Sequence, residues 1–267
     1  MIEVASTDPV LNRQNLGHRL DCGIAERAAI GLIVLATDQT IEYEFRRLLD
    51  LPGVALYESR ILNDARITPE TLVAMEARLV EAAALILPGL PLDVIAFGCT
   101  SASMVIGEAR VGERVREARP GIACTTPITA AFAAFQALGV HRLALLTPYR
   151  DDLNRFMRGY IEDRGFTVPV MGSFNEEDDR RAARIDAASV RDAAIELGRS
   201  DLVDAVFVSC TSLRLIDALG AIEAELGKPV TSSNHAMAWH CLRLAGIADH
   251  RAEFGMLFER PLDQAAP

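Results

Sequence analysis

The chain has 267 residues, half of them hydrophobic and only 6% aromatic, so it can bury a sizeable core built mainly from aliphatic side chains. A formal net charge of -10 without any basic run excludes a protein that binds nucleic acid through concentrated positive charge. Lys228 is the only lysine and lies in a Gly-Lys-Pro turn, which argues against Schiff-base chemistry.

Membrane and metal signals are missing from the sequence. The most apolar region, residues 82–99, is interrupted by prolines, a glycine and an aspartate, and the N-terminus lacks the basic start and apolar run of a secretion signal. The five cysteines, at positions 22, 99, 124, 210 and 241, form neither a Cys-x-x-Cys pair nor a metal-ligand spacing. We therefore expect a cytoplasmic protein with reduced thiols that binds no metal and no membrane.

Along the chain, a polar arm over residues 1–30 gives way to short aliphatic runs that alternate with longer amphipathic segments. This alternation is typical of βαβ units and predicts an α/β fold with buried parallel strands. The expected strands are 31–37, 53–60, 93–98, 121–125, 142–147, 167–172, 204–209 and 228–232. The expected helices are 41–50, 69–87, 101–118, 127–138, 151–164, 186–198, 213–226 and 235–245.

The eight strands divide into two sets of four that resemble each other. The segment from Asp93 to Ser101 matches the segment from Asp204 to Ser212 at an offset of 111, and four further matches follow in order, among them 62–63 with 174–175. An internal duplication therefore predicts two similar four-stranded halves, over 31–141 and 142–247, that are related by pseudo-twofold symmetry. We expect residues 248–267 to form a C-terminal tail that packs on the first half.

Two cysteines occupy matched positions in this repeat. Cys99 and Cys210 each end a predicted strand, precede Thr-Ser and start a helix, where free backbone N–H groups favour a thiolate. A single cysteine at a strand end is most often a small hydrophobic residue, but a matched pair favours chemistry. The neighbouring hydroxyls that can cap these helices and donate to a substrate carboxylate are those of Thr100, Ser101, Thr211 and Ser212.

These motifs resemble the aspartate/glutamate racemase superfamily, and within it the maleate isomerase and arylmalonate decarboxylase branch. The similarity covers about residues 30–247 and rests on the two Cys-Thr-Ser motifs, on 146–149 with 153–154, and on 125–127. The resemblance implies an enzyme that needs no cofactor. The presence of both cysteines is similar to the isomerases and racemases, because the decarboxylase keeps only the second.

The resemblance also implies roles for three further residues. Tyr149 matches a tyrosine that hydrogen-bonds the substrate, and Asn175 matches an asparagine in a variable loop, where a plain turn residue is nearly as good an interpretation. Asp38 stands where maleate isomerases have an asparagine that contacts a substrate carboxylate. Its loop looks like that of the ectoine-utilisation proteins, whose substrates carry one carboxylate and one amidinium, and a carboxylate at position 38 could pair with that cation.

The sequence thus predicts a cofactor-independent isomerase, racemase or epimerase that acts at the carbon α to a carboxylate of a small molecule, an ectoine-type compound being one candidate. Maleate cis–trans isomerisation by covalent addition of Cys99 is the alternative, and a catalytically silent small-molecule binding protein is another. The acidic run 176–181 is most simply a solvated loop and the start of a helix, and a flap over the site is the alternative. A homodimer is common for such folds, although no sequence feature specifies one.

Overall fold

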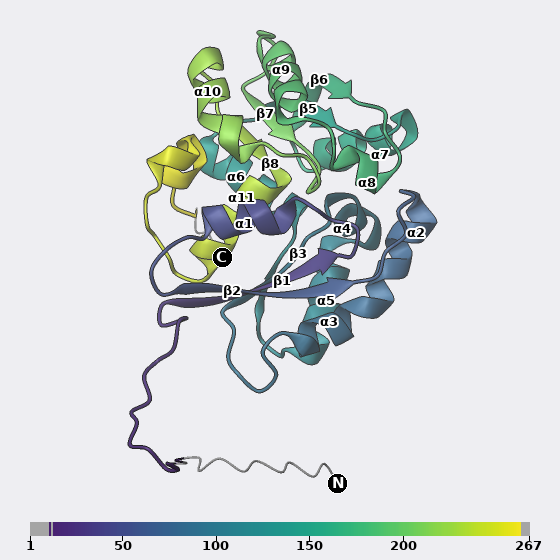
Figure 1. Cartoon of the computed structure of the whole chain (residues 1–267). Helices are drawn as coiled ribbons and strands as arrows, with labels where there is room; N and C mark the ends of the chain where they lie inside the picture. Colours follow the sequence, from purple (N-terminus) through teal and green to yellow (C-terminus); the bar gives the residue numbers. More distant parts are fainter. Residues whose placement is uncertain (1–10, 12, 263–267) are drawn as a thin grey trace.

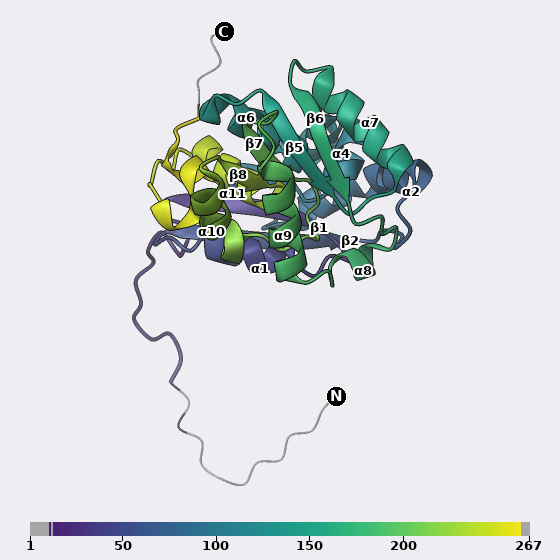
Figure 2. The ribbon, with the colours of Figure 1, turned by 90° about the horizontal axis from the view of Figure 1, so that it is seen from above.

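The computed structural model describes residue 11 and residues 13–262, and it contains two four-stranded parallel sheets (Figures 1 and 2). The first sheet has the order β2-β1-β3-β4 and the second has the matching order β6-β5-β7-β8. The strands are β1 (Ala28–Leu35), β2 (Val54–Ile61), β3 (Val94–Phe97), β4 (Ala123–Thr125), β5 (Arg142–Thr147), β6 (Thr167–Ser173), β7 (Ala205–Val208) and β8 (Val230–Ser232). The predicted α/β fold with two similar halves is confirmed.

Helices cover both faces of the sheets, so the central strands β1, β3 and β7 are buried along their whole length. The α-helices are α1 (Ile41–Leu48), α2 (Pro69–Val73), α3 (Leu79–Leu85), α4 (Thr100–Ile106), α5 (Glu108–Ala118), α6 (Pro127–Leu138), α7 (Asp151–Glu162), α8 (Asp179–Ala182), α9 (Ala187–Gly198), α10 (Ile216–Leu226) and α11 (Ser233–Leu244). Short 3-10 helices are η1 (Ala74–Arg78), η2 (Ala252–Phe254) and η3 (Met256–Glu259). No helix among the described residues is long and apolar enough to cross a membrane.

Two of the expected helices are interrupted. The expected helix 69–87 consists of α2, η1 and α3, and the expected helix 101–118 breaks at Gly107, whose φ of 93° lies outside the range that a helix allows. The helix expected from residue 213 begins only at Ile216. The four-residue helix α8 begins within the acidic run 176–181, where the sequence predicts a solvated loop and the start of a helix.

The two halves share their packing through α6 and α11, which lie between the sheets in Figure 1. Ala130 and Ala134 of α6 belong to the core around β1 and β3, whereas Phe135 on another face belongs to the core around β5 and β7. Helix α11 follows the second sheet, yet its fully buried Trp239 packs in the first core. The two sheets are therefore fixed against each other by apolar packing.

The ends of the described chain behave differently. Residues 13–24 run away from the body of the molecule as an exposed arm (Figures 1 and 2). At the other end, Phe254 and Phe258 pack in the core around β1, and Arg251 donates to the carbonyl of Leu48. The predicted division into an arm, two halves and a tail stays a prediction, since the crossed packing of α6 and α11 ties the halves together.

Candidate active site

Cys99 and Cys210 lie at the carboxyl ends of β3 and β7, the central strands of the two sheets. Cys99 is the N-cap residue of α4, and its carbonyl accepts from the backbone N–H of Ser103 at 3.1 Å. Cys210 precedes a turn, and its sulfur accepts from the backbone N–H of Ser212 at 3.4 Å. Each thiol therefore lies at the carboxyl edge of its sheet, where parallel α/β folds bind their ligands.

Both thiols line one small cavity of about 20 Å³, which has room for roughly one water molecule. Its lining residues are Leu35, Asn63, Asp64, Arg66, Ile67, Thr71, Leu72, Met75, Cys99, Ser101, Tyr149, Asp179, Cys210 and Thr211. The cavity in this conformation is too small for an organic substrate. Binding therefore requires that the residues over it move apart.

Burial dominates the acidity of both thiols. It raises the pKa of Cys99 and the pKa of Cys210 to about 12, and the nearby carboxylates of Asp38 and Asp179 raise both pKa values further. The backbone N–H of Ala102 and that of Ser212 act in the opposite direction, but they do not outweigh burial. In the closed cavity both cysteines are therefore neutral thiols at neutral pH.

The side chain of Tyr149 lies close to both thiols. Its phenol is 4% exposed and hydrogen-bonds the side chains of Cys210 and Ser101, and burial, with the charge of both cysteines, raises the pKa of the phenol well above 10. The backbone carbonyl of Tyr149 accepts from the amide of Asn154 at 2.8 Å, and its N–H donates to Thr147. The neutral phenol is thus held as a hydrogen-bond donor between the two halves.

Asp38 is buried beside the cavity, in the loop between β1 and α1. Its Oδ1 accepts from the backbone N–H groups of Thr40 and Ile41, at 2.7 and 2.8 Å, and so caps α1. Its Oδ2 is buried without a hydrogen-bond partner among the described residues, although the side chain of Thr211 lies near enough to lower the pKa. Burial is the larger effect and, with the charge of Asp179, it raises the pKa of Asp38 to about 7.

Two residues that line the cavity, Asp179 and Asn63, were not predicted from the sequence. Asp179, at the start of α8, accepts from the hydroxyls of Ser212 (2.9 Å) and Thr37. Asn63 exchanges two hydrogen bonds with Thr37, at 2.7 and 3.2 Å. Asn63 could have been found, because the repeat matches it to Asn175, whereas Asp179 lies in an acidic run that gave no positional signal.

The remaining predicted residues divide into those at the cavity and those behind it. Ser101 and Thr211 line the cavity, whereas the hydroxyl of Thr100 donates to Ser233 at 2.8 Å. The hydroxyl of Ser212 donates to Asp179, which lines the cavity, whereas Ser212 itself does not line it. Asn175 is exposed in a left-handed turn with a φ of 54°, and it does not line the cavity.

A strap of two short segments, 65–67 and 177–179, closes the cavity from both halves. Arg66 and Asp178 form an antiparallel β-bridge. On either side of it, the N–H of Ile67 donates to the carbonyl of Glu177 at 3.3 Å, and the N–H of Asp179 donates to the carbonyl of Ala65 at 3.1 Å. These backbone hydrogen bonds join the two halves at residues that line the cavity, among them Ile67 and Asp179. The acidic run is therefore part of the cover of the site.

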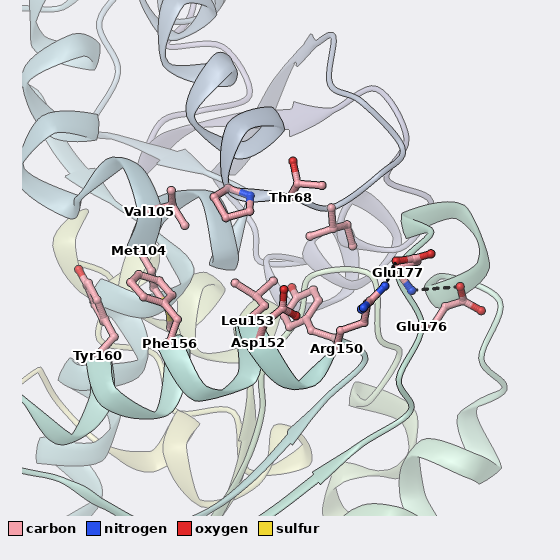
Figure 3. A pocket seen from close by; sticks show the side chains of 13 residues that line it. Thr68, Met104, Val105, Arg150, Asp152, Leu153, Phe156, Tyr160, Glu176 and Glu177 are labelled. Atoms are coloured by element: carbon pink, nitrogen blue, oxygen red, sulfur yellow. Dashed lines mark hydrogen bonds and ion pairs between the residues drawn. The ribbon is translucent and has the colours of Figure 1, made fainter.

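A larger cavity of about 530 Å³, here called the vestibule, opens beside the strap (Figure 3). Ile67 and Tyr149 line both this space and the thiol cavity. Figure 3 shows Phe156 on α7 facing Met104 on α4 across an apolar floor, with the Arg150–Glu177 ion pair of 2.9 Å at one end. Movement of Ile67 would join the two spaces into a cavity of substrate size.

Residues outside the cavity have structural partners. Cys241 is buried in the core around β1, and Cys22 is exposed in the arm. His235 bonds the carbonyl of Phe254 at 2.8 Å, and burial lowers its pKa to about 4. In the part of the chain that the structure describes, no group of three His, Cys, Asp or Glu residues is placed to hold a metal ion.

Comparison with known proteins gives a consistent match over most of the chain. The sequence model of the arylmalonate decarboxylase family matches residues 30–258. Arylmalonate decarboxylase of Bordetella bronchiseptica is 32% identical over 241 residues, which cover 88% of this chain and 98% of that protein. Maleate isomerase of Nocardia farcinica is 31% identical over 227 residues, which cover 80% of this chain and 88% of that protein.

The match extends to solved structures. A cysteine-to-serine mutant of the Nocardia farcinica maleate cis-trans isomerase, with a covalently bound succinylcysteine intermediate, superposes with a TM-score of 0.75 at 28% identity. The superposition covers 82% of this chain and 93% of that chain. In that protein a cysteine thus carries a covalent adduct.

Proposed function

The chain belongs to the arylmalonate decarboxylase family, and from this premise we propose that it is a cofactor-independent isomerase, racemase or epimerase. It acts at the carbon α to a carboxylate of a small molecule. The observation that carries the proposal is the meeting of Cys99 and Cys210, one from each half, at a single cavity. Two proton-transfer groups on opposite faces are what inversion needs, because a base on one face returns the isomer it received.

The proposed reaction moves one proton across the substrate. One cysteine, as thiolate, takes the proton from the α-carbon, and the electron pair of the broken C–H bond moves into the carboxylate as an enediolate. The other cysteine, as thiol, gives its proton to the opposite face. The charge of the enediolate is held by backbone N–H groups at the start of α4 and by the hydroxyls of Ser101 and Thr211, which line the cavity.

The reaction requires one thiolate, whereas both thiols in the closed cavity have a pKa of about 12. Burial is the first cause of that pKa, so access of solvent and substrate to the cavity lowers it. The neutral Tyr149 phenol donates to Cys210 and favours its thiolate, since the same contact lowers the pKa of Cys210. The opening of the strap is therefore linked to the activation of the thiols.

Maleate cis–trans isomerisation is the second candidate, favoured by the succinylcysteine of the Nocardia relative. The Cys99 thiolate would add to one alkene carbon, the thiol of Cys210 would give a proton to the other, and rotation about the new single bond would follow. Return of the proton and loss of the thiolate would release fumarate. Its test is a maleate-sized mass increase on Cys99 when Cys210→Ser protein is incubated with maleate.

The proposed substrate is an ectoine-type compound, and the proposal is supported by the buried carboxylate of Asp38 beside the cavity. We also propose that Asn175 enters the site when the strap rearranges around a bound substrate. The enzyme would act in the cytoplasm, a proposal that the five free cysteines support, since such thiols suit a reducing compartment. Assembly as a homodimer stays a proposal.

A screen without any added cofactor tests the proposed function. Maleate, aspartate, hydantoins and ectoines are incubated with the protein in deuterated buffer and followed by NMR and polarimetry. We expect α-deuterium incorporation with net inversion, or cis–trans conversion, of one carboxylate. If ligands bind and no substrate exchanges or converts, the protein is a small-molecule binding protein and the proposal is wrong.

A further inference from the structure

Asp38 holds one buried carboxylate oxygen next to Thr211, a residue that lines the cavity. Two backbone N–H groups at the start of α1 donate to its Oδ1 and hold the side chain in one orientation. The other carboxylate oxygen, Oδ2, takes no part in these hydrogen bonds. That atom is fully buried without a partner among the described residues, on the side of Thr211, which lines the cavity. A buried acceptor without a hydrogen-bond donor is unfavourable, so a ligand group that donates to Oδ2 would be stabilised there.

A second carboxylate lies close to Asp38 and comes from the other half of the chain. Asp179 is 7% exposed and lines the thiol cavity, and its charge raises the pKa of Asp38. Its two oxygens are oriented by the hydroxyls of Ser212 and Thr37, the latter being the neighbour of Asp38. The two hydroxyls leave each oxygen with a free lone pair.

Positive charge from the protein does not offset these two acids at the cavity. Arg60 reaches only the backbone carbonyl of Asp38, at 3.2 Å, and its guanidinium pairs with Glu42 at 2.7 Å. Of the described residues that line the cavity, Arg66 is the one cation, and it is exposed on the strap. A cationic group of a ligand would supply the counter-charge for Asp179, and also for Asp38 once it ionises above its pKa of about 7.

We propose that Asp38 and Asp179 together form a cation subsite, so that the substrate is a zwitterion. This inference rests on the proposed function and names its substrate class. The carboxylate of the substrate lies between the two Cys-Thr-Ser segments, and its ammonium or amidinium nitrogen donates to the two aspartates. Asp179 is thereby a specificity-determining residue, with Asp38 as its partner from the other half.

The subsite also explains how the thiols become active. The charges of Asp38 and Asp179 raise the pKa of both Cys99 and Cys210. A bound cation neutralises these charges and lowers both pKa values, whereas a second carboxylate raises them. A zwitterion thus favours the thiolate that its own conversion requires, and a dicarboxylate opposes it.

Three probes of matched size test the subsite: β-alanine, butyrate and succinate, which carry an ammonium, a methyl group and a carboxylate at the same end. Binding is measured by calorimetry at about pH 8.5, above the pKa of about 7 that burial gives Asp38. We expect β-alanine to bind about tenfold tighter than butyrate, and succinate to bind weakest. Asp38→Asn and Asp179→Asn should each weaken β-alanine about tenfold and tighten succinate.

The controls separate the subsite from its surroundings. Asp152→Asn removes a carboxylate from the vestibule and should leave the order of the probes unchanged, and melting temperatures show whether each variant is folded. Tighter binding of succinate than of β-alanine to the wild-type protein would overturn the subsite, whether or not substrates exchange. Loss of α-proton exchange with the order β-alanine, butyrate, succinate intact would instead overturn the proposed function alone.

Discussion

The two halves of the molecule carry the same Cys-Thr-Ser motif in different local structures. Cys99 is the N-cap residue of α4, so its thiol lies at a helix start, where the backbone N–H of Ala102 lowers its pKa. After Cys210 the chain makes a turn, and α10 begins only at Ile216, whose N–H donates to Glu44 of the first half. The helix after Cys99 thus begins directly at the cysteine, whereas the turn after Cys210 is held by a side chain of the first half.

The halves also differ at a second matched position. Asp38 and Tyr149 occupy equivalent loops at an offset of 111, yet one presents a carboxylate and the other a neutral phenol. The two residues have kept equivalent positions in the repeat, but one side chain is a carboxylate and the other a phenol. If the proposed function is right, a substrate meets a donor on the side of Tyr149 and an acceptor on the side of Asp38, and this difference would fix its orientation.

The largest expected effect comes from replacing either thiol. Cys99→Ser and Cys210→Ser should each reduce net conversion by about 10²–10⁴-fold, because a serine hydroxyl is a far weaker acid and nucleophile than a thiol. Each variant should still exchange the proton on the face of its remaining cysteine. Steady-state polarimetry and deuterium exchange by NMR measure the two quantities, and near-wild-type inversion in either variant would show that one thiol suffices.

The next effect concerns stability and separates Asp38 from Tyr149. Native Asp38 keeps its proton up to a pKa of about 7, whereas an unfolded aspartate loses it near 3.8, so the native state binds more protons between these values and loses stability as pH rises. Asp38→Asn removes this loss and should be more stable than wild type by up to about 4 kcal/mol above pH 7.

Chemical denaturation at several pH values checks this prediction. The stability difference between Asp38→Asn and wild type should grow from about pH 4 to about pH 7 and then stay constant. His235 and His240, whose pKa values burial lowers to about 4, titrate alike in both proteins. Tyr149→Phe serves as the matched comparison, because its phenol has a pKa raised well above 10 and adds no such slope. A pH-independent gain in Asp38→Asn would show that the native carboxyl titrates normally.

Glu44 tests the dependence of the Cys210 site on the first half. Its carboxylate is fully buried, accepts from the N–H groups of Leu215 and Ile216, and accepts from the amide of Asn234 at 2.8 Å. Asn234 in turn donates to the carbonyl of Thr211. Glu44→Gln places an amide donor against the Asn234 amide and should cost about 1–3 kcal/mol of stability.

The two thiols should report this change unequally. Alkylation followed by peptide mass analysis should show that Glu44→Gln accelerates the reaction of Cys210 and leaves that of Cys99 near its original rate. Glu42→Gln is the matched control on the same helix, because its surface ion pairs contribute little. Equal acceleration of both thiols would mean that the variant loosens the whole molecule rather than the Cys210 turn.

The sequence predicted all eight strands and the meeting of the two cysteines, because buried parallel strands are apolar runs and the repeat made their order visible. The sequence did not predict the contacts of Asp179 and Glu44 with the other half, because contacts between residues far apart in the chain leave no local periodicity. It left the acidity of the thiols open, because helix N–H groups and burial act in opposite directions and only packing decides between them. The break at Gly107 also lay within an otherwise helical pattern.

The smallest expected effect concerns Asn63 and Asn175, the last matched pair. Asn63 lines the cavity, whereas Asn175 has a φ of 54° in an exposed turn that glycine adopts without strain. Asn175→Gly should therefore change stability by less than about 0.5 kcal/mol. Asn63→Gly, by contrast, removes two hydrogen bonds to Thr37 and should lower stability by about 1–2 kcal/mol. The KM of Asn175→Gly then decides its role. A rise of about tenfold with kcat unchanged is expected if Asn175 contacts the substrate after the strap rearranges, whereas an unchanged KM assigns Asn175 to the turn alone.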